Sequence, residues 1–560
     1  MQQVGIRTIA FDPARGFVLN GKPYPRKLIG ANRHQDYAVV GNALSNNLHW
    51  RDAAKLKAAG MEIIRNAHYP QDPAFMDACD QLGLLVIVNT PGWQFWNDEP
   101  IFGERVYDDV RNMVRRDRNR PSVVMWEPIL NETWYPEEFA GRVHDIVHEE
   151  YPFPGCYTAS DSEAKGHEHF EIQFAHPTVG EKESAAAHID PTKVYFTREW
   201  GDNVDDWSSH NSTSRAARGW GEVPQLVQTN HYAKNDYSST SYDALYRAPA
   251  YHFGGTLWHA FDHQRGYHPD PFYGGIMDAF RRPKYSYEMF RAQYRSASAE
   301  PMVFIANELT PFSPEDVTVF SNCDTVVLHT FFGTDTVRTY VRGRDSDTTG
   351  LPSPVIVFPK AWNFMADKAL SRGGRQGEAY ILVEGIRHGR VAASQKKSMS
   401  RRPSKLELIV NREGAHAVAD GSDLVTVVAR ITDGKGVVKR LNNRSVRFTI
   451  EGEGQLLIPA SQAAGVPLVW GEAPVLVQTS TTAGTIRVRA EMAGVQGDWT
   501  PLAAEIEFRT VAPLQDLIYM DAEIERSPNL SPVSAQAAAR QSEELLKQVE
   551  AQQEAFGEQR

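Results

Sequence analysis

The sequence predicts a multidomain protein in which a (β/α)8 barrel is followed by two β-sandwiches and a C-terminal helical tail. Short β-branched runs alternate with helical stretches up to residue 298, and residues 534–556 are rich in Ala, Gln and Glu. From Pro301 onward, strand runs with turn residues between them recur roughly every ten residues. Alternating strands and helices are typical of a parallel sheet and eight such units of a closed barrel, whereas closely spaced strands are typical of sandwiches.

The barrel is predicted over residues 26–298. Its strands are expected at residues 26–32, 62–66, 84–89, 122–126, 157–159, 170–174, 194–197 and 254–258, and helices at 50–59, 73–81, 102–119 and 139–150. Gly60 and Gly83 follow two of these helices, as expected of residues that end a helix in the left-handed conformation. A doubly wound open sheet is the alternative, but no strand is followed by the Gly-rich phosphate loop typical of that fold.

The remainder of the chain is predicted to contain two further domains. Residues 299–400 and 404–510 are expected to form one β-sandwich each, with the basic linker KKSMSRRPS at residues 396–404 between them. Residues 511–533 contain three prolines and are expected to be an extended linker, so that residues 511–560 form a linker and helical tail.

The composition argues against several classes of partner. Asp and Glu outnumber Lys and Arg by 70 to 59, for a formal net charge of −11. Neither a nucleic acid nor a membrane is therefore expected as a partner. No apolar run reaches the roughly 18 residues of a membrane span. The three cysteines are far apart, so they predict neither a disulfide framework nor a metal site.

Three predicted strands run into carboxylates. The fourth is followed by Glu127 and then by Asn131 and Glu132, the seventh by Glu199, and the eighth by Asp262. Reactive groups of (β/α)8 barrels lie where the strands end, so Glu132 and Glu199 are expected to face each other across a cleft. Two opposed carboxylates are the equipment for glycoside hydrolysis, in which one protonates the leaving oxygen and the other attacks the anomeric carbon or activates water.

Histidine and tryptophan are concentrated before residue 299, which holds 15 of the 18 His and 9 of the 12 Trp. This imbalance favours a ligand site in the first half of the chain, although a more aromatic core is the simpler alternative. An aromatic floor suits a sugar because its C–H faces stack on aromatic rings. The tryptophans beside predicted strand ends are Trp93, Trp96, Trp134, Trp200 and Trp258.

Five segments in the first half resemble glycoside hydrolase family 2, which holds β-galactosidases, β-glucuronidases and β-mannosidases. They are GIRTIAFD…GFVLNGKPY…LIGANRHQD from Gly5, IIRNAHYPQDPAFMDACDQLGLLV from Ile63, RDRNRPSVVMWEPILNE from Arg116, FTREWGD from Phe196 and GGTLWHAFD from Gly254. The resemblance covers about residues 4–295. It implies a (β/α)8 barrel enzyme that retains the configuration of the anomeric carbon. Residues 299–400 resemble the immunoglobulin-like domain that follows the barrel in many bacterial members, and 404–510 resemble a second one of the invasin type.

The resemblance implies roles for individual residues. Glu132 would be the acid/base and Glu199 the nucleophile. Asn131 would hydrogen-bond the sugar 2-hydroxyl, which strengthens in the transition state. Arg65 would brace Glu199 and keep it ionised, and His68 would bind substrate.

Four more residues are expected to bind substrate. His34 follows the first strand as a sugar ligand, Trp258 would form a wall for the terminal sugar, and Trp200 belongs to the aromatic floor. Asp262 could bind a hydroxyl or cap the loop that follows it.

The sequence departs from the family pattern in three places. Four residues separate Trp126 from Asn131 where the family has three, which predicts a bulge or longer loop and makes Glu127 a third candidate carboxylate. The sixth strand lacks the Tyr that often contacts the nucleophile, which leaves Gln173 or His176 as substitutes. The family's N-terminal jelly-roll and first sandwich are not in the sequence. Residues 1–25 are therefore expected to be a lead-in strand from a missing sandwich, and Met1 a fragment boundary or truncated gene start.

These inferences predict a retaining exo-β-glycosidase that removes terminal β-linked sugars from an oligosaccharide, with β-galactosides as the first choice. A β-glucuronidase is the alternative, for which Arg265 could reach the sugar carboxylate, and a β-mannosidase is the third choice. From another class, the alternative is a catalytically impaired carbohydrate-binding or scaffold protein.

No cofactor is expected from the sequence. Some members of the family bind Mg²⁺ or Na⁺ near the acid/base, but the sequence places no ligands for such an ion. The chain is expected to be soluble, and periplasmic or secreted in a bacterium.

Overall fold

The computed structural model describes residues 5–177, 190, 192–202, 212–234, 240–264, 271–294, 300–345, 351–372, 379–494 and 500–514. The chain divides into two units, Met1–Val511 and Ala512–Arg560. The predicted tail at residues 534–556 lies outside the described residues. Within the described ranges, no helix has both the length and the apolar character needed to cross a membrane.

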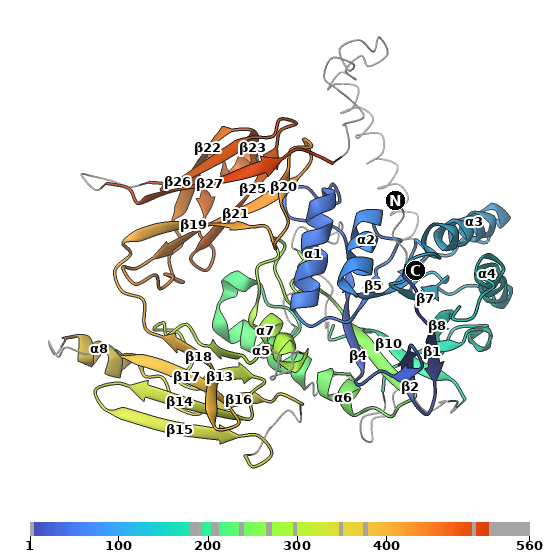
Figure 1. Ribbon diagram of the computed structural model, residues 1–560, viewed down its shortest axis with the longest axis horizontal. Coiled ribbons are helices and arrows are strands. Elements are labelled where there is room, and N and C mark those ends of the chain that lie inside the picture. Colours follow the sequence, from blue (N-terminus) through green and yellow to red (C-terminus); the bar gives the residue numbers. More distant parts are fainter. Residues whose placement is uncertain are drawn as a thin grey trace, which may run out of the picture. The chain divides into compact units, whose positions relative to one another are not determined.

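A barrel of eight parallel strands forms the first half of the molecule (Figure 1). Its strands are β4 (Leu28–Arg33), β5 (Ile63–Asn66), β6 (Leu85–Asn89), β7 (Val123–Glu127), β8 (Ala159–Asp161), β9 (Ile172–Phe174), β10 (Val194–Trp200) and β11 (His252–Leu257). They pair in the order β7-β6-β5-β4-β11-β10-β9-β8. The Trp126 amide donates to the Tyr157 carbonyl at 2.9 Å, and Trp126 forms a parallel bridge with Thr158, so β7 and β8 close the ring. The prediction of a (β/α)8 barrel is confirmed.

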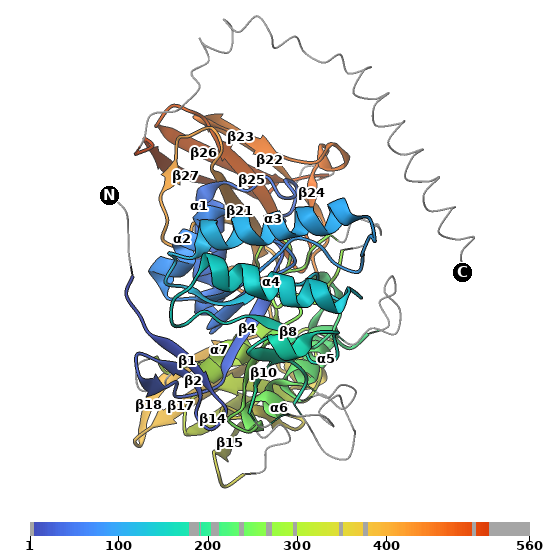
Figure 2. The ribbon, with the colours of Figure 1, turned by 90° about the vertical axis from the view of Figure 1, so that its right-hand side faces the viewer.

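Helices follow most of the strands. They are α1 (Asn46–Ala58), α2 (Pro73–Leu82), α3 (Pro100–Asp117), α4 (Glu137–Glu150), α5 (Glu222–Ala233), α6 (Tyr242–Arg247) and α7 (Tyr285–Tyr294). α1 begins at Asn46 rather than at residue 50 because the Ser45 side chain accepts a hydrogen bond from the Leu48 amide and caps the helix. Gly83 ends α2 with φ 68°, the left-handed conformation expected of it. Figure 2 shows α3 and α4 side by side on the outer side of the barrel.

Residues 5–25 form a small three-stranded antiparallel sheet rather than a single lead-in strand. It consists of β1 (Ile9–Asp12), β2 (Gly16–Leu19) and β3 (Lys22–Pro23). The Phe11 ring packs on Phe17 and Phe253 with centroid distances of 5.2 and 4.7 Å. Phe17 shares a core cluster with Leu28 and Ile63, the first residues of β4 and β5. The small sheet therefore packs at the end of the barrel where the strands begin.

The two β-sandwiches follow the barrel as predicted. In the first, one sheet has the order β12 (Val303–Ala306), β13 (Val317–Ser321) and β16 (Val355–Phe358). The other has the order β15 (Asp335–Val341), β14 (Thr325–Phe331), β17 (Tyr380–Arg387) and β18 (Arg390–Lys397), and the helix α8 (Phe364–Arg372) precedes β17. Buried residues alternate with partly exposed ones along β14 and β17, as expected of strands with one face on a core.

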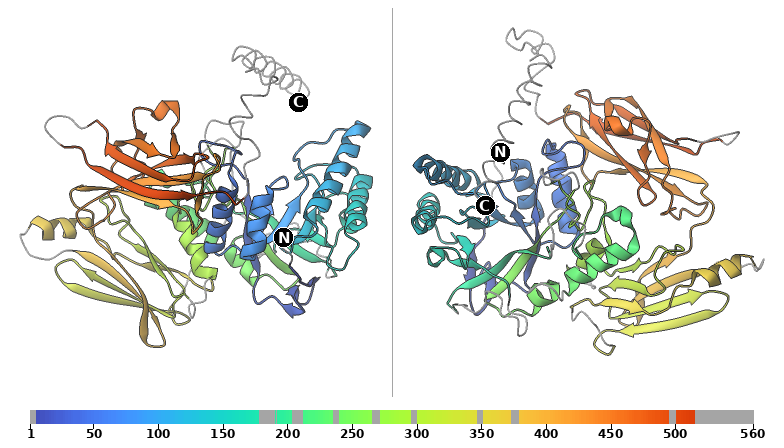
Figure 3. Two further views of the ribbon diagram at one scale, coloured as in Figure 1. Left: turned by 45° about the horizontal axis from the view of Figure 1, so that its top comes forward. Right: turned by 180° about the vertical axis from the view of Figure 1, so that it is seen from behind.

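In its described residues, the second sandwich has nine strands in two sheets, drawn in orange to red in Figure 3. One sheet has the order β19 (Lys405–Asn411), β21 (Leu424–Thr432), β25 (Glu472–Thr479) and β23 (Gly454–Leu457). The other has the order β20 (Ala417–Val418), β27 (Ala503–Val511), β26 (Thr485–Met492), β22 (Ser445–Gly452) and β24 (Val466–Pro467). Val427 and Val475 of one sheet share a core with Val446 and Val488 of the other.

Candidate active site

Five strand ends bring the candidate site residues together. Because the strands are parallel, their carboxyl ends meet at one end of the barrel. The residues at or just after these ends are His34 (β4), Arg65 (β5), Glu127, Asn131 and Glu132 (β7), Glu199 (β10) and Trp258 (β11).

Arg65 is the centre of this arrangement and is fully buried. Its Nε and Nη2 donate to the two oxygens of Glu127 at 2.7 and 2.5 Å, and its Nη1 donates to Glu199 Oε1 at 2.7 Å. Nη1 and Nη2 also donate to the side-chain oxygens of Asn32 and Asn131 at 2.9 and 3.0 Å. A guanidinium has five N–H donors, so all of them are used and the plane of the group is fixed.

Glu127, the third candidate carboxylate, is fully buried and gives both oxygens to Arg65. A carboxylate in this state has no exposed oxygen with which to meet a substrate. Its contact instead fixes Arg65. Although burial opposes it, the charges of Glu127 and Glu199 raise the pKa of Arg65, so the guanidinium stays charged beside Glu199.

Glu199 differs from Glu127 because its side chain is 23% exposed. The structure brings Arg65 against Glu199 Oε1, as the sequence predicts, and places His68 Nε2 3.9 Å from the same oxygen. Burial raises the pKa of Glu199, while Arg65 and Arg198 oppose that rise. The carboxylate thus combines an open side with an arginine that favours its ionised form.

The loop that carries Glu132 pairs with the loop after β6. The Asn131 amide donates to the Gly92 carbonyl at 3.1 Å, and the Gln94 amide donates to the Asn131 carbonyl at 2.9 Å. A Cβ on Gly92, whose φ is 126°, would lie 2.8 Å from Leu130, so this close approach requires a glycine.

Glu132 lies at the surface of the cleft. Its Oε2 accepts a hydrogen bond from Gln94 Nε2 at 2.7 Å. Its backbone φ is 48°, a left-handed conformation that costs a non-glycine residue on the order of 1 kcal/mol and is concentrated at functional sites. The surrounding loops hold this conformation and so fix the backbone position from which the Glu132 side chain extends.

Imidazole and indole rings form one wall of the cleft. The His68 ring stacks on Trp258 with a centroid distance of 5.1 Å and an interplanar angle of 11°. The His34 ring meets both rings edge-on at 5.6 and 5.5 Å. Burial, followed by the charge of Arg65, lowers the pKa of His68 well below its usual value. His68 is therefore a neutral imidazole, and its buried Nδ1 has no hydrogen-bond partner in the described part of the chain.

Two cavities meet at the two candidate carboxylates. Glu132 and Glu199 line both of them. The smaller cavity, of about 510 Å³, is also lined by His34, His68, Asn131 and Trp258. The larger cavity, of about 890 Å³, is also lined by Trp134, Asp161, His176 and Arg198. Most of the predicted substrate residues thus gather around the smaller cavity.

The prediction for Trp200 needs correction. Trp200 borders the larger cavity, but its side chain is 2% exposed and its ring packs on Tyr232 and Phe290, which belong to α5 and α7. Its indole therefore supports the barrel wall and presents no face to a sugar. Trp93 and Trp134, at 53% and 84% exposure, are the tryptophans that face the two cavities openly.

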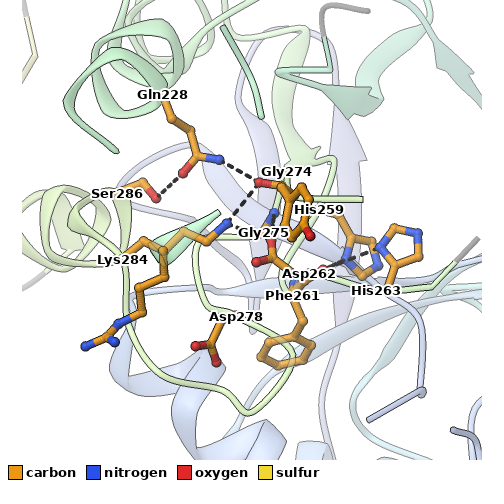
Figure 4. Close-up of polar contacts among 12 residues, drawn as sticks. Gln228, His259, Phe261, Asp262, His263, Gly274, Gly275, Asp278, Lys284 and Ser286 are labelled. Atoms are coloured by element: carbon orange, nitrogen blue, oxygen red, sulfur yellow. Dashed lines mark hydrogen bonds and ion pairs between the residues drawn. The ribbon is translucent and has the colours of Figure 1, made fainter. Parts of the chain in front are cut away.

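Of the two roles predicted for Asp262, the structure agrees with the capping of the loop that follows it. It is 3% exposed and lines neither of the two cavities. Its Oδ1 accepts hydrogen bonds from Lys284 Nζ at 2.6 Å and from the Gly275 amide at 3.0 Å (Figure 4). Burial raises the pKa of Asp262 to about 7 against the influence of Lys284. Through these hydrogen bonds Asp262 stabilises the loop after β11.

The sequence reasoning missed three residues of the cleft. Arg198 Nη1 contacts Asp161 Oδ2 at 3.0 Å on the wall of the larger cavity, and Gln94 binds Glu132. Asp161 ends β8 and Gln94 follows β6, so the rule that strand ends carry the site could have found both. Arg198 adjoins Glu199 in the sequence.

The proposed substitutes for the strand-6 tyrosine are separated by the structure. The Gln173 amide donates to the carbonyls of His167 and Phe170 at 2.7 and 3.1 Å, so it is not directed at Glu199. His176 does line the larger cavity. Arg265 lies outside the described residues.

In the described ranges, three His, Cys, Asp or Glu side chains bring ligand atoms within 4.8 Å of one another only at His144, His148 and Glu171, which lie outside the cleft.

Glycoside hydrolases with a (β/α)8 barrel carry two carboxylates in a cleft at the strand ends. This chain has that arrangement, and an arginine holds one of the two carboxylates. Two parts of the chain match models of glycoside hydrolase family 2. The family model described as "Glycosyl hydrolases family 2, TIM barrel domain" matches residues 13–149, and "Glycoside hydrolase family 2 C-terminal domain 5" matches residues 406–499.

Known relatives agree with this assignment. A β-galactosidase of Thermoanaerobacter pseudethanolicus is 29% identical over 470 residues, which cover 81% of this chain and 58% of the relative. A β-glucuronidase of Bacteroides fragilis is 32% identical over 173 residues, which cover 29% of this chain and 24% of the relative. The crystal structure of a β-glycosidase from Bacteroides vulgatus has the same fold, with a TM-score of 0.67 at 20% identity over 90% of this chain and 66% of that one. The chain thus spans about three-fifths of the curated relative that it matches over most of its own length.

Proposed function

We propose that the protein is a retaining exo-β-glycosidase with Glu199 as nucleophile and Glu132 as acid/base. One observation carries this proposal. Glu132 and Glu199 line both cavities, so a glycosidic bond that bridges the cavities would have its anomeric carbon and its oxygen beside the two carboxylates. The match of residues 13–149 to the barrel model of glycoside hydrolase family 2 supports it independently.

In the first step, a Glu199 oxygen attacks the anomeric carbon while Glu132 donates its proton to the glycosidic oxygen, whose bond to that carbon breaks. A covalent glycosyl ester forms on Glu199, and the leaving group departs as an alcohol. Arg65 keeps Glu199 ionised for the attack, and Glu127 keeps Arg65 in place.

In the second step, Glu132 takes a proton from water, and the water oxygen attacks the anomeric carbon as the ester bond to Glu199 breaks. Both carboxylates return to their starting states. Two inversions give net retention, so the released sugar is the β-anomer.

The terminal sugar is assigned to the smaller cavity. Stacked His68 and Trp258 offer it an apolar wall, and the His34 and His68 rings and the Asn131 amide offer hydrogen bonds to hydroxyl groups. The leaving group then occupies the larger cavity, where the exposed Trp134 can meet a second sugar or another ring.

The charge of the smaller cavity favours a neutral sugar, and a β-galactoside is the first choice. Its described lining contains no Lys or Arg, and it includes Asp36 and Asp202 besides the two glutamates. A glucuronide would bring a further negative charge into this surrounding at a Coulombic cost. The name of the relative that matches most of the chain, a β-galactosidase, supports the same choice, and β-glucuronides remain the second candidate.

The test uses the purified full chain with aryl β-galactoside, β-glucuronide and β-mannoside, followed by proton NMR during the first minutes of hydrolysis. We expect the galactoside to be hydrolysed fastest and the first product to be its β-anomer. An initial α-anomer would refute retention. Sugar binding without turnover, measured by calorimetry on the same preparation, would favour the carbohydrate-binding alternative.

A further inference from the structure

Outside the cleft, two histidines and a glutamate converge on the outer side of the barrel. His144 and His148 lie one helical turn apart on α4, the outer helix labelled in Figure 2, and Glu171 directly precedes β9. The Nε2 atoms of the two histidines lie 3.2 and 3.0 Å from the same atom, Glu171 Oε1. We call these three residues the outer histidine cluster. The mechanism proposed above uses none of them.

Two members of the outer histidine cluster, His144 and Glu171, are each oriented by a second contact. His144 Nδ1 lies 3.2 Å from a carboxylate oxygen of Asp145. The other Glu171 oxygen accepts hydrogen bonds from the amide and the hydroxyl of Thr158, both at 2.7 Å. Ligand histidines with a carboxylate on their second nitrogen, and ligand carboxylates with their own hydrogen bonds, are typical of metal sites because these contacts fix the tautomer and direct the lone pairs.

The geometry points to a divalent transition-metal site at His144, His148 and Glu171, with zinc as the preferred ion and water at the remaining position. Atoms bound to zinc at about 2.0–2.2 Å lie about 3.3–3.6 Å apart in a tetrahedral site. The two nitrogen–oxygen distances of 3.2 and 3.0 Å are close to that spacing, so small side-chain movements would admit the ion. Two imidazoles and one carboxylate suit zinc better than magnesium or calcium.

The side chains are accessible enough for an ion to enter. His144, His148 and Glu171 are 20%, 34% and 32% exposed. Cys156 contacts His148 but stands outside the group of ligand atoms that lie within 4.8 Å of one another. We therefore assign the cluster three protein ligands rather than four.

A metal here would tie α4 to the segment that enters β9. β9 ends at Phe174, which lines the larger cavity together with His176. The ion would thus stabilise one wall of that cavity from outside, and its binding does not depend on the proposed hydrolysis.

The test is zinc binding by the full chain after removal of metal with a chelator. Competition with a chromophoric chelator gives the stoichiometry and affinity, and thermal unfolding gives an independent readout. We expect one zinc per chain and a higher unfolding temperature with zinc. His148→Ala and Glu171→Gln should each weaken binding at least about 100-fold, and Asp145→Asn about 10-fold.

His169→Ala is the matched control. The exposed His169 ring lies 6.3 Å from that of His144 but is not a member of the outer histidine cluster, so this variant should bind zinc like the parent. Glu171→Gln keeps the size of the side chain and an acceptor for Thr158, so it is expected to fold even if His148→Ala does not. Absence of stoichiometric zinc from the parent chain, or binding that survives both ligand substitutions, would overturn the proposal.

Discussion

Two buried clusters in the described part of the barrel bring arginines against carboxylates in opposite ratios, and of these two only one lines a cavity. In the cleft, Arg65 pairs with Glu127 and Glu199. In the wall between β4 and α1, Asp52 pairs with Arg33 and Arg281. The residue types are the same, but the ratio is reversed: the cleft has two carboxylates on one arginine, and the wall has two arginines on one carboxylate.

The wall cluster is closed on every side. Asp52 is fully buried and accepts from Nε and Nη2 of both arginines at 2.7–3.3 Å. The guanidinium carbons of Arg33 and Arg281 lie 4.1 and 3.9 Å from the ring centres of Phe75 and Phe261. By contrast, Glu199 keeps 23% of its side chain exposed. The open carboxylate, rather than the arginine that holds it, therefore separates a reactive cluster from a structural one.

The largest effect is expected for Glu199→Ala. This substitution removes the nucleophile but leaves Arg65 paired with Glu127, so kcat should fall about 10,000-fold or more while the chain stays folded. Initial rates on an aryl β-galactoside and a thermal unfolding curve measure the two quantities. Activity within tenfold of the parent would show that Glu199 does not form the covalent bond.

A smaller effect with a distinctive substrate dependence is expected for Glu132→Gln. Loss of the acid should slow hydrolysis of alkyl β-galactosides about 100- to 10,000-fold. With a p-nitrophenyl leaving group, which departs without a proton, the first step should be nearly normal and a burst of p-nitrophenol should precede slow turnover. Equal losses on both substrates would argue for another proton donor.

Substitution in the wall cluster should lower the free energy of unfolding rather than kcat. Asp52→Asn leaves two buried arginines without a counter-charge, which we expect to lower the free energy of unfolding by about 3–5 kcal/mol. The kcat of the molecules that remain folded should be unchanged, because Asp52 lines neither cavity. Urea unfolding and active-site titration measure the two effects. A loss of kcat without a loss of stability would contradict the division between the clusters.

The pattern of strand ends in the sequence was enough to predict the barrel and the two open carboxylates. It left Glu127 as a third candidate beside Glu132, because a single extra residue precedes Asn131 and the burial of Glu127 depends on the end of β7 and on its partner Arg65. The sequence left two roles open for Asp262 because its partner Lys284 lies 22 residues further along the chain.

Trp200 was misjudged for a different reason. The predicted seventh strand ended at residue 197, whereas β10 continues to Trp200. Successive side chains of a strand point to opposite faces, so Glu199 faces the cleft and Trp200 faces the helices. A strand end placed three residues early conceals this alternation.

The smallest expected effect in this comparison is a loss of stability at low pH. Although burial opposes it, Arg281 and Arg33 lower the pKa of Asp52 to about 2. Because an unfolded Asp titrates near pH 3.9, ionised Asp52 adds stability above that pH, and this contribution of about 2–3 kcal/mol is lost as the pH falls toward 2. Urea unfolding between pH 5 and pH 2.5 should therefore show a steeper acid loss in the parent than in Asp52→Asn.

Asp12→Asn provides the control for this acid dependence. The Asp12 carboxylate accepts hydrogen bonds from Arg15 and the Ala14 amide, which lower its pKa, but it lies at the surface, where water can replace those contacts. The pH dependence of this variant should follow that of the parent. An equal flattening in Asp12→Asn and Asp52→Asn would mean that acid acts on the total charge of the chain rather than on the closed cluster.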